Sequence, residues 1–171
     1  MQEMFLRHVL RSRHFDSHKI RFRPSPAGRG AAEQFVREEY PGEVRKVRSR
    51  AQQNVGLIAM IDADRASLRT RFRQFNQKLL DADQARRGSR ERIAVMIARR
   101  NLETWIAYLV PLADGVSEAA ACATGADPYK RLVNNKNVPP AACAYVGQLQ
   151  GARATPAVPS LKASFSELRR V

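Results

Sequence analysis

Two short, strongly apolar runs constrain the fold of this chain more than any other feature. They read VGLIAMI, at 55–61, and RIAVMIA, at 92–98. Each has the length of a strand, and its apolar side chains do not alternate with polar ones, which is typical of strands buried on both faces of a parallel sheet. Between the runs, apolar residues recur at helical spacing: Leu68, Phe72, Phe75 and Leu79. A strand, a crossover helix and a second strand form the connection that a parallel sheet requires.

The remaining patterns extend this order. Alternating apolar and basic residues in KIRFRP predict another strand at 19–23. Apolar residues recurring at helical spacing predict helices at 2–15, at about 31–52 with a break or kink at Pro41–Gly42, and at 102–109. We therefore expect an α/β protein with a mostly parallel sheet of three to four strands and with helices on both faces.

The C-terminal third has weaker signals. It begins as loop with room for one short helix, and then 139–149 and 159–170 each fit a helix, joined by the linker GARATPAVP. We expect residues 1–112 to form the α/β domain and residues 113–171 to be a loop and helical C-terminal extension packed on the same domain. A chain of 171 residues is long enough for one compact domain with a real core.

Positive charge is concentrated in the first 100 residues. They hold 23 of the 30 Lys and Arg and 11 of the 16 acids, and so carry +12 of the net charge of +14. A basic half on a globular domain predicts a polyanionic partner, here DNA or RNA, because neutralising phosphates releases counterions. A solvated arginine-rich surface, as arises in high-GC genomes, gives the same count, and charge alone leaves both interpretations open.

The sequence predicts a cytoplasmic protein without a membrane partner. No run approaches the apolar length of a membrane span. The N-terminal apolar stretch is interrupted by Glu3, Arg7 and His8, unlike that of a signal peptide. Cys122 and Cys143 lack CxxC spacing and lie in alanine-rich surroundings, so we interpret them as reduced core residues.

Two carboxylates, Asp62 and Asp64, directly follow the first apolar run. Ligands bind outside the carboxyl ends of parallel strands, and side chains two apart in an extended chain point the same way. We therefore expect both carboxylates to face one point, where Mg²⁺ or Mn²⁺ relieves their repulsion. The same spacing also fits a helix cap at Asp64 and an ion pair between Asp62 and an arginine.

A second polar group follows the other apolar run. The segment ARRNLETW, at 98–105, places Arg99, Arg100, Asn101 and Glu103 at the same edge if the two strands are adjacent. Carboxylates beside arginines and an asparagine suit a metal-bridged phosphate, since acids hold the ion and arginines hold the phosphoryl oxygens. A helix N-cap at Asn101, with Glu103 in the first turn, is the structural alternative, and both interpretations can hold together.

Three arginines of the predicted crossover helix complete the basic edge. Arg65, Arg69 and Arg73 lie one turn apart, opposite the apolar residues of that helix. We expect them to bind a nucleic-acid backbone together with Arg99, Arg100 and Asn101. We interpret Trp105, in contrast, as a core residue and not as a platform for stacked bases.

Together, GLIAMIDAD and ARRNLETWIAYL resemble the TOPRIM-like family, the metal-binding α/β module of topoisomerases, primases and overcoming-lysogenization-defect nucleases. The resemblance covers roughly residues 1–112, and is nearest to small stand-alone bacterial members that are often encoded beside an ATPase. It implies a TOPRIM/Rossmann-like fold, Mg²⁺ or Mn²⁺ as cofactor, and nuclease-like chemistry on DNA or RNA, in a phage-defence or DNA-repair context with an ATPase partner. Asp62 and Asp64 match the metal ligands, and Glu103 and Arg100 are the candidate catalytic residues.

One residue of the family pattern has no counterpart here. The family's glutamate ends a strand placed before the first helix, whereas this sequence opens in that helix, and Glu3 lies inside it. We expect the missing strand either to be encoded upstream of Met1 or to have been lost. Without that acid/base, we expect the chain to bind metal weakly and to cleave DNA or RNA poorly.

Two other functions remain open from the sequence. A non-catalytic nucleic-acid-binding or regulatory subunit would use the same basic edge, or would dock on an ATPase through its C-terminal helices. A flavodoxin-like nucleotide-binding domain would use PAGRG, at 26–30, but this segment lacks the GxGxxG or Walker spacing.

Overall fold

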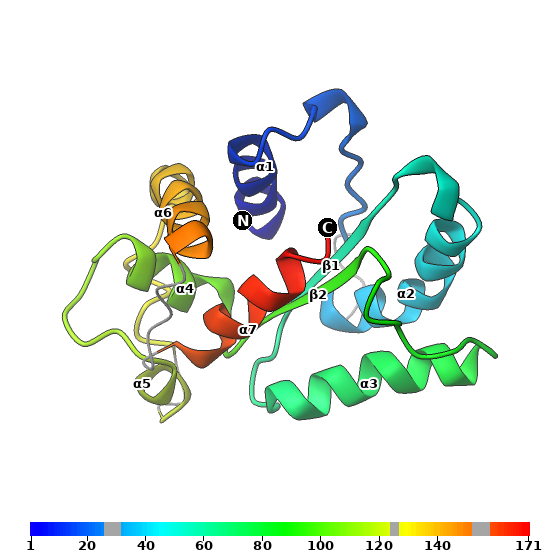
Figure 1. Ribbon diagram of the computed structural model, residues 1–171. Coiled ribbons are helices and arrows are strands. Elements are labelled where there is room, and N and C mark those ends of the chain that lie inside the picture. The colour runs from blue at the N-terminus through cyan, green and yellow to red at the C-terminus, as the bar shows by residue number, and fades with distance from the viewer. Residues whose placement is uncertain (26–31, 124–126, 152–157) are drawn as a thin grey trace.

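The protein is an α/β structure built on two parallel strands. The computed structural model describes residues 1–25, 32–123, 127–151 and 158–171. Strands β1 (Leu57–Asp62) and β2 (Ile93–Ala98) pair in register, with the first and last residues of one opposite those of the other. Figure 1 shows the two strands side by side at the centre of the molecule. The sequence predicted both strands to within two residues at either end.

Helices surround this pair of strands. The α-helices are α1 (Gln2–Ser12), α2 (Ala32–Arg48), α3 (Leu68–Asp81), α4 (Leu102–Leu109), α5 (Glu118–Ala123), α6 (Val138–Gly151) and α7 (Pro159–Leu168). Short 3₁₀ helices occur at Ser17–Lys19, Ala51–Gln53 and Asn135–Asn137. Helix α2 continues through Pro41, so of the predicted break or kink the break does not occur.

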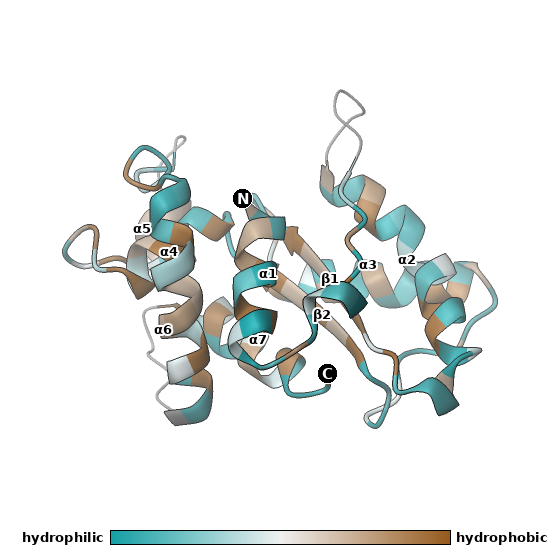
Figure 2. Ribbon diagram, turned by 90° about the horizontal axis from the view of Figure 1, so that it is seen from above, coloured by the Kyte–Doolittle hydropathy of each residue, from teal (hydrophilic) through white to brown (hydrophobic). Residues whose placement is uncertain are grey.

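The two faces of the sheet pack against different helices. Because side chains alternate along a strand, the odd-numbered residues of β1 and β2 pack with α2 and α3, where Tyr40 and Phe75 stack edge to face. The even-numbered residues pack with α1, α4, α6 and α7 around Trp105, which is fully buried as predicted. Figure 2 shows α1, α4, α6 and α7 on one side of the strands and α2 and α3 on the other.

The predicted third strand at 19–23 does not form. Lys19 ends a 3₁₀ helix, and the residues after it make no strand pairing. The alternation has another cause: Phe22 lies under the guanidinium of Arg7 on α1, 4.2 Å from the ring centroid, whereas Arg23 pairs with two glutamates of α2 at 2.7 Å. The segment therefore bridges two helices. In the parts of the chain that the structure describes, the sheet has two strands, not three or four.

Helix α7 occupies the outer edge of β2, where a third strand would otherwise lie. The backbone N–H of Val95 donates to Oε2 of Glu167 (2.8 Å), and that of Arg99 donates to Oγ of Ser160 (3.0 Å). The carbonyl of Ile93 accepts hydrogen bonds from two arginine side chains. Side chains of α7, together with Arg87 and Arg170, thus satisfy backbone groups that a neighbouring strand would satisfy.

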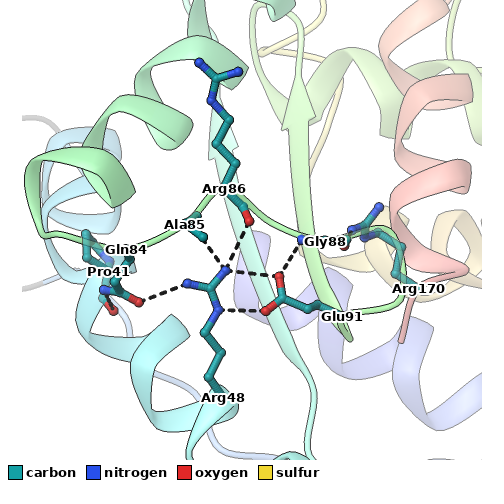
Figure 3. A network of polar contacts seen from close by, with 8 residues as sticks. All are labelled: Pro41, Arg48, Gln84, Ala85, Arg86, Gly88, Glu91 and Arg170. Atoms are coloured by element: carbon teal, nitrogen blue, oxygen red, sulfur yellow. Dashed lines mark hydrogen bonds and ion pairs between the residues drawn. The ribbon is translucent and has the colours of Figure 1, made fainter.

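The loop between α3 and β2 is held by one arginine of α2 (Figure 3). Arg48 donates to both carboxylate oxygens of Glu91, at 2.7 and 3.1 Å, and to the carbonyls of Ala85 and Arg86. The carboxylate of Glu91 also accepts the backbone N–H of Gly88. This network lies at the amino end of β2, so it fixes the crossover without contributing to the opposite edge of the sheet.

The remaining expectations concern the two cysteines, membrane-spanning helices and two loop segments. Cys122 and Cys143 are exposed free thiols, which corrects their interpretation as core residues. No described helix combines the length and the apolar character that a membrane crossing needs. The PAGRG segment, at 26–30, lies outside the described residues, as does most of the linker at 151–159.

Candidate nucleic-acid interface

Two loops meet at the carboxyl edge of the sheet, one after each strand. Beyond β1, the N–H of Ala63 donates to the carbonyl of Ala98 (2.8 Å), and that of Asp64 donates to the carbonyl of Arg100 (3.0 Å). Asp64 and Arg100 both have left-handed backbone, with φ of 53° and 68°. The two loops are therefore paired with each other at the edge where parallel α/β sheets bind ligands, which makes them a candidate site.

Asp62 is a part-buried carboxylate at the end of β1. Its Oδ1 accepts the backbone N–H of Leu102 at 3.0 Å, and its carboxylate also accepts a hydrogen bond from the side chain of Gln2. Burial, and then the charge of Glu103, raise the pKa of Asp62 from 3.8 to about 7, and the charge of Asp64 adds to the shift. Asp62 therefore supports the start of α4 and keeps its proton to a higher pH than an ordinary carboxylate.

Asp64 is exposed and faces a different environment. The extended backbone ends at Asp62, and the left-handed conformation of Asp64 breaks the alternation that was expected to aim both carboxylates at one point. Asp64 lines a cavity in which its Oδ2 lies 3.9 Å from Nη2 of Arg71, and Asp62 is not part of that lining. Asp64 is not a helix cap either, because Ser67 caps α3 by accepting the N–H of Thr70.

The cavity beside Asp64 has a volume of about 650 Å³ and a strongly basic wall. Five cationic side chains line it, against the two carboxylates of Asp64 and Asp127; the five are Arg65, Arg71, Arg100, Lys130 and Arg131. A neighbouring cavity of about 420 Å³ shares Asp64, Arg65 and Arg100 with it and adds Arg99. The edge of the sheet is therefore a concave surface that attracts anions.

Arg71 forms the buried part of this basic wall and is 8% exposed. Its Nη1 contacts Glu33 and Gln74, each at 3.1 Å, and its Nη2 donates to the carbonyl of Ala63 at 3.2 Å. Its Nε is buried and has no hydrogen-bond partner among the described residues. The contacts to Ala63 and Glu33 hold the guanidinium of Arg71 beside the first residue of the loop that follows β1.

The residues predicted from ARRNLETW separate into two groups. Arg99, Arg100 and Asn101 line the cavities, and Asn101 is also the N-cap of α4, accepting the N–H of Thr104 at 3.3 Å. Glu103 is part-buried in the first turn of α4 and lines neither cavity. Its contribution at this edge is the negative charge that raises the pKa of Asp62.

The three arginines expected along the crossover helix are all exposed. Arg65 precedes α3 and lines both cavities, whereas Arg69 and Arg73 lie on the solvent face of α3, away from buried Phe75. They extend the basic surface from the cavities along the helix that begins beside them.

Sequence reasoning missed Arg71, Asp127, Lys130 and Arg131. Arg71 carried a recognisable signal, because it lies four residues before Phe75 and thus on the apolar side of α3, where a charged residue needs a partner. No comparable signal marked the segment 127–131. It reaches the sheet edge only through the tertiary packing of the C-terminal part.

The residues at this edge fit a weakly held metal ion only. No group of three or more His, Cys, Asp or Glu side chains within the described ranges is arranged to hold one. Asp62 and Asp64 supply two carboxylates, and one of them already accepts hydrogen bonds from Leu102 and Gln2. Because the two carboxylates do not face one point, they offer Mg²⁺ at most a single-carboxylate contact each, which suffices only for an ion that keeps most of its waters.

Comparison of the chain with protein-family models, with curated proteins and with solved structures finds no match. The interpretation of this edge therefore depends on its own geometry and charge.

Proposed function

We propose that this chain is a TOPRIM-like protein that binds the sugar-phosphate backbone of DNA or RNA at the carboxyl edge of its sheet. The observation that carries the proposal is the set of five cationic side chains around one cavity, at the point where both strands end. Exposed Arg69 and Arg73 continue this basic surface along α3. Phosphate contacts by arginine and lysine provide most of the affinity in non-specific nucleic-acid binding.

The lining of the two cavities favours backbone binding without strong sequence preference. None of the described lining residues is aromatic, so the site offers no platform on which bases stack. Trp105, the one tryptophan of the chain, is fully buried. Sequence readout requires contacts with base edges, whereas contacts with phosphates determine position only.

A second candidate function is metal-dependent phosphodiester cleavage. The observation that favours it is electrostatic: the charges of Glu103 and Asp64 both raise the pKa of Asp62, so three carboxylates act on one another at this edge. A divalent cation relieves such repulsion, and we propose that Asp62 and Asp64 hold Mg²⁺ or Mn²⁺ weakly. Glu103 would then be the candidate acid for proton transfer, and Arg100 the candidate cation for a phosphoryl oxygen.

The binding proposal is tested by titrating fluorescent single-stranded and duplex oligonucleotides with the protein at several salt concentrations, in the presence of a chelator. We expect log affinity to fall linearly with log salt for DNA and RNA of unrelated sequence. The double variant Arg69→Ala/Arg73→Ala should bind more weakly and reduce the salt slope on duplex DNA by about 2, because each lost phosphate contact removes about 0.9 from it.

A matched control removes the same charge elsewhere. Arg86 and Arg90 are exposed in the loop at the amino end of β2, away from the candidate interface. Arg86→Ala/Arg90→Ala should leave the salt slope unchanged. A slope near zero for the wild-type protein, or equal losses in the two double variants, would contradict binding at the carboxyl edge and assign the net charge to a solvated surface.

A further inference from the structure

One cation of the cavity beside Asp64 is buried. Binding of a nucleic-acid backbone along the protein surface does not require a buried cation. Arg71 is 8% exposed, and its Nε lacks a partner among the described residues. The carboxylate of Glu33 is shared between Arg71, at 3.1 Å, and Arg37, at 2.6 Å, and the only other carboxylate that pairs with Arg71 among the described residues is that of exposed Asp64, at 3.9 Å. A buried arginine with an unused donor at a cavity wall indicates an anionic ligand inside that cavity.

Two other lining cations of this cavity belong to a segment whose backbone is anchored to the core. Lys130 and Arg131 follow Tyr129, which is 6% exposed and whose hydroxyl accepts the N–H of Ser117 at 3.2 Å. The N–H of Tyr129 donates to Oδ1 of Asp127 at 2.8 Å. Oδ2 of Asp127 is buried and has no hydrogen-bond partner within the described residues. The backbone that carries Lys130 and Arg131 therefore needs little ordering when a ligand binds.

This arrangement distinguishes two kinds of phosphate. A phosphodiester inside a strand is flanked by sugars on both sides and lies along a surface. A phosphomonoester at a strand end has one ester bond, three free oxygens and up to two negative charges, so it can enter a recess and meet donors on several sides. The volume of about 650 Å³ lies in the range typical of small-molecule sites and admits a terminal nucleotide.

We propose that this cavity binds the terminal phosphate of a DNA or RNA strand, with Arg71 on one side of its oxygens and Lys130 and Arg131 on the other. The inference rests on the proposed function and deepens it, because it assigns end recognition to an interface otherwise expected to bind any backbone position. Arg65 and Arg100, which line the same cavity, would contact the next phosphate of the strand.

The inference is tested with one short oligonucleotide prepared in three forms: with a 5′-phosphate, with a 3′-phosphate, and with hydroxyls at both ends. Affinities are measured by competition against a common labelled strand, with a chelator present so that no cleavage occurs. We expect one phosphorylated form to bind about tenfold more tightly than the hydroxyl form, since several charge-assisted hydrogen bonds are gained. The form that gains affinity identifies the end that enters the cavity.

Two double variants, each removing two exposed cations of the C-terminal part, locate the effect. Lys130→Ala/Arg131→Ala changes the cavity wall, and Lys136→Ala/Lys162→Ala changes residues outside it. The first should reduce the preference for the phosphorylated end to about twofold or less, and the second should retain it. Circular dichroism melting curves of both variants show that the fold is intact.

The other outcomes would contradict the terminal-phosphate site, and one of them would also contradict the proposed function. Equal affinity for all three forms overturns the terminal-phosphate site and leaves backbone binding standing. A preference that survives in Lys130→Ala/Arg131→Ala, or that is lost in both double variants, also overturns it, because the preference then arises elsewhere or from net charge alone. Absence of binding to any form, at any salt concentration, refutes the proposed function and this inference together.

Discussion

Asp62, the last residue of β1, accepts a hydrogen bond from the backbone N–H of Leu102, the first residue of α4, at 3.0 Å. This contact joins the end of one strand to the helix that follows the neighbouring strand. It satisfies one of the N–H groups that every helix leaves free at its start, and it places a carboxylate at the positive end of the helix dipole. Asp62 is therefore a structural residue of this edge, whatever else it binds.

The raised pKa of Asp62 predicts a pH-dependent stability. Between its ordinary value of 3.8 and its folded value of about 7, the folded protein keeps a proton that the unfolded chain releases. The free energy of unfolding should therefore fall as pH rises from about 4 to about 7 and then level off. In chelator, Asp62→Asn should remove this fall and stabilise the protein by roughly 1–3 kcal/mol at about pH 8, because the amide oxygen still accepts the N–H of Leu102.

Urea denaturation at a series of pH values measures this effect. Asp114→Asn, a substitution of an exposed carboxylate outside the site, is the control and should follow the wild-type curve. If Asp62→Asn and the wild-type protein differ by a constant amount at every pH, Asp62 is not the group that causes the dependence.

The outcome for 19–23 and for α7 shows which parts of the fold the sequence can predict. The two buried strands and α4 follow from local apolar patterns, and their bounds were predicted closely. The alternation at 19–23 is equally regular, but its side chains contact α1 and α2, and sequence alone does not distinguish a strand from an extended bridge. The covering of β2 by Glu167 and Ser160 of α7 is a contact over 60 residues or more along the chain, which no local pattern encodes.

The candidate site was predictable to a similar extent. That Asp62, Asp64, Arg100 and Asn101 share one edge followed from the topology of parallel strands, and the backbone pairing of Asp64 with Arg100 confirms the adjacency on which this depended. The direction of each carboxylate did not follow, because the left-handed backbone of Asp64 is set by its pairing with the second loop. The far wall of the cavity could not be predicted, since it belongs to the C-terminal extension.

Glu167 should be important for stability, because it replaces a strand at the edge of β2. Its carboxylate accepts the N–H of Val95 at 2.8 Å and pairs with Arg87 at 2.5 Å, and both side chains of the pair are largely buried. Glu167→Ala leaves a buried N–H and a buried guanidinium without this partner, so we expect a loss of about 2–4 kcal/mol. The neighbouring exposed Ser166→Ala should cost less than about 0.5 kcal/mol.

Chemical denaturation of the two variants provides the comparison, and backbone binding at low salt serves as a second readout. The Glu167→Ala protein should still bind nucleic acid wherever it remains folded, since Glu167 does not line the cavities. A loss no greater than that of Ser166→Ala would mean that α7 does not stabilise the strand edge through this contact.

Asn101 has two roles that substitution can separate. As the N-cap of α4 its Oδ1 accepts the N–H of Thr104 at 3.3 Å, and as a lining residue it faces the cavity. Asn101→Ala should lower the free energy of unfolding by about 1 kcal/mol, whereas Asn101→Ser, which retains a capping oxygen, should lower it by a few tenths. If nucleic-acid affinity falls equally in both variants, the amide contacts the ligand; if it falls only with stability, Asn101 is a cap alone.

Metal binding by this chain should be weak. Asp62 has part of its carboxylate engaged by Leu102 and Gln2 and has a raised pKa, and no third carboxylate or histidine completes a metal-binding group among the described residues. Millimolar Mg²⁺ should therefore raise the free energy of unfolding by less than about 1 kcal/mol, as expected for a ligand present near its dissociation constant. Asp64→Asn should remove this effect, and Asp114→Asn should retain it.

Cleavage of DNA or RNA should also be slow, because the candidate acid/base is poorly placed. Phosphodiester hydrolysis needs a group that moves a proton at the attacking or leaving oxygen, and a well-placed acid/base contributes about 10²–10⁴ in rate. Glu103 is the acid whose charge most affects the pKa of Asp62, but it is part-buried in the first turn of α4 and lines neither cavity. We therefore expect little Mg²⁺- or Mn²⁺-dependent nicking of plasmid DNA or RNA at protein concentrations that saturate binding. Robust cleavage that is lost in Glu103→Gln, with binding and melting temperature unchanged, would show instead that Glu103 reaches the substrate and acts as the acid/base.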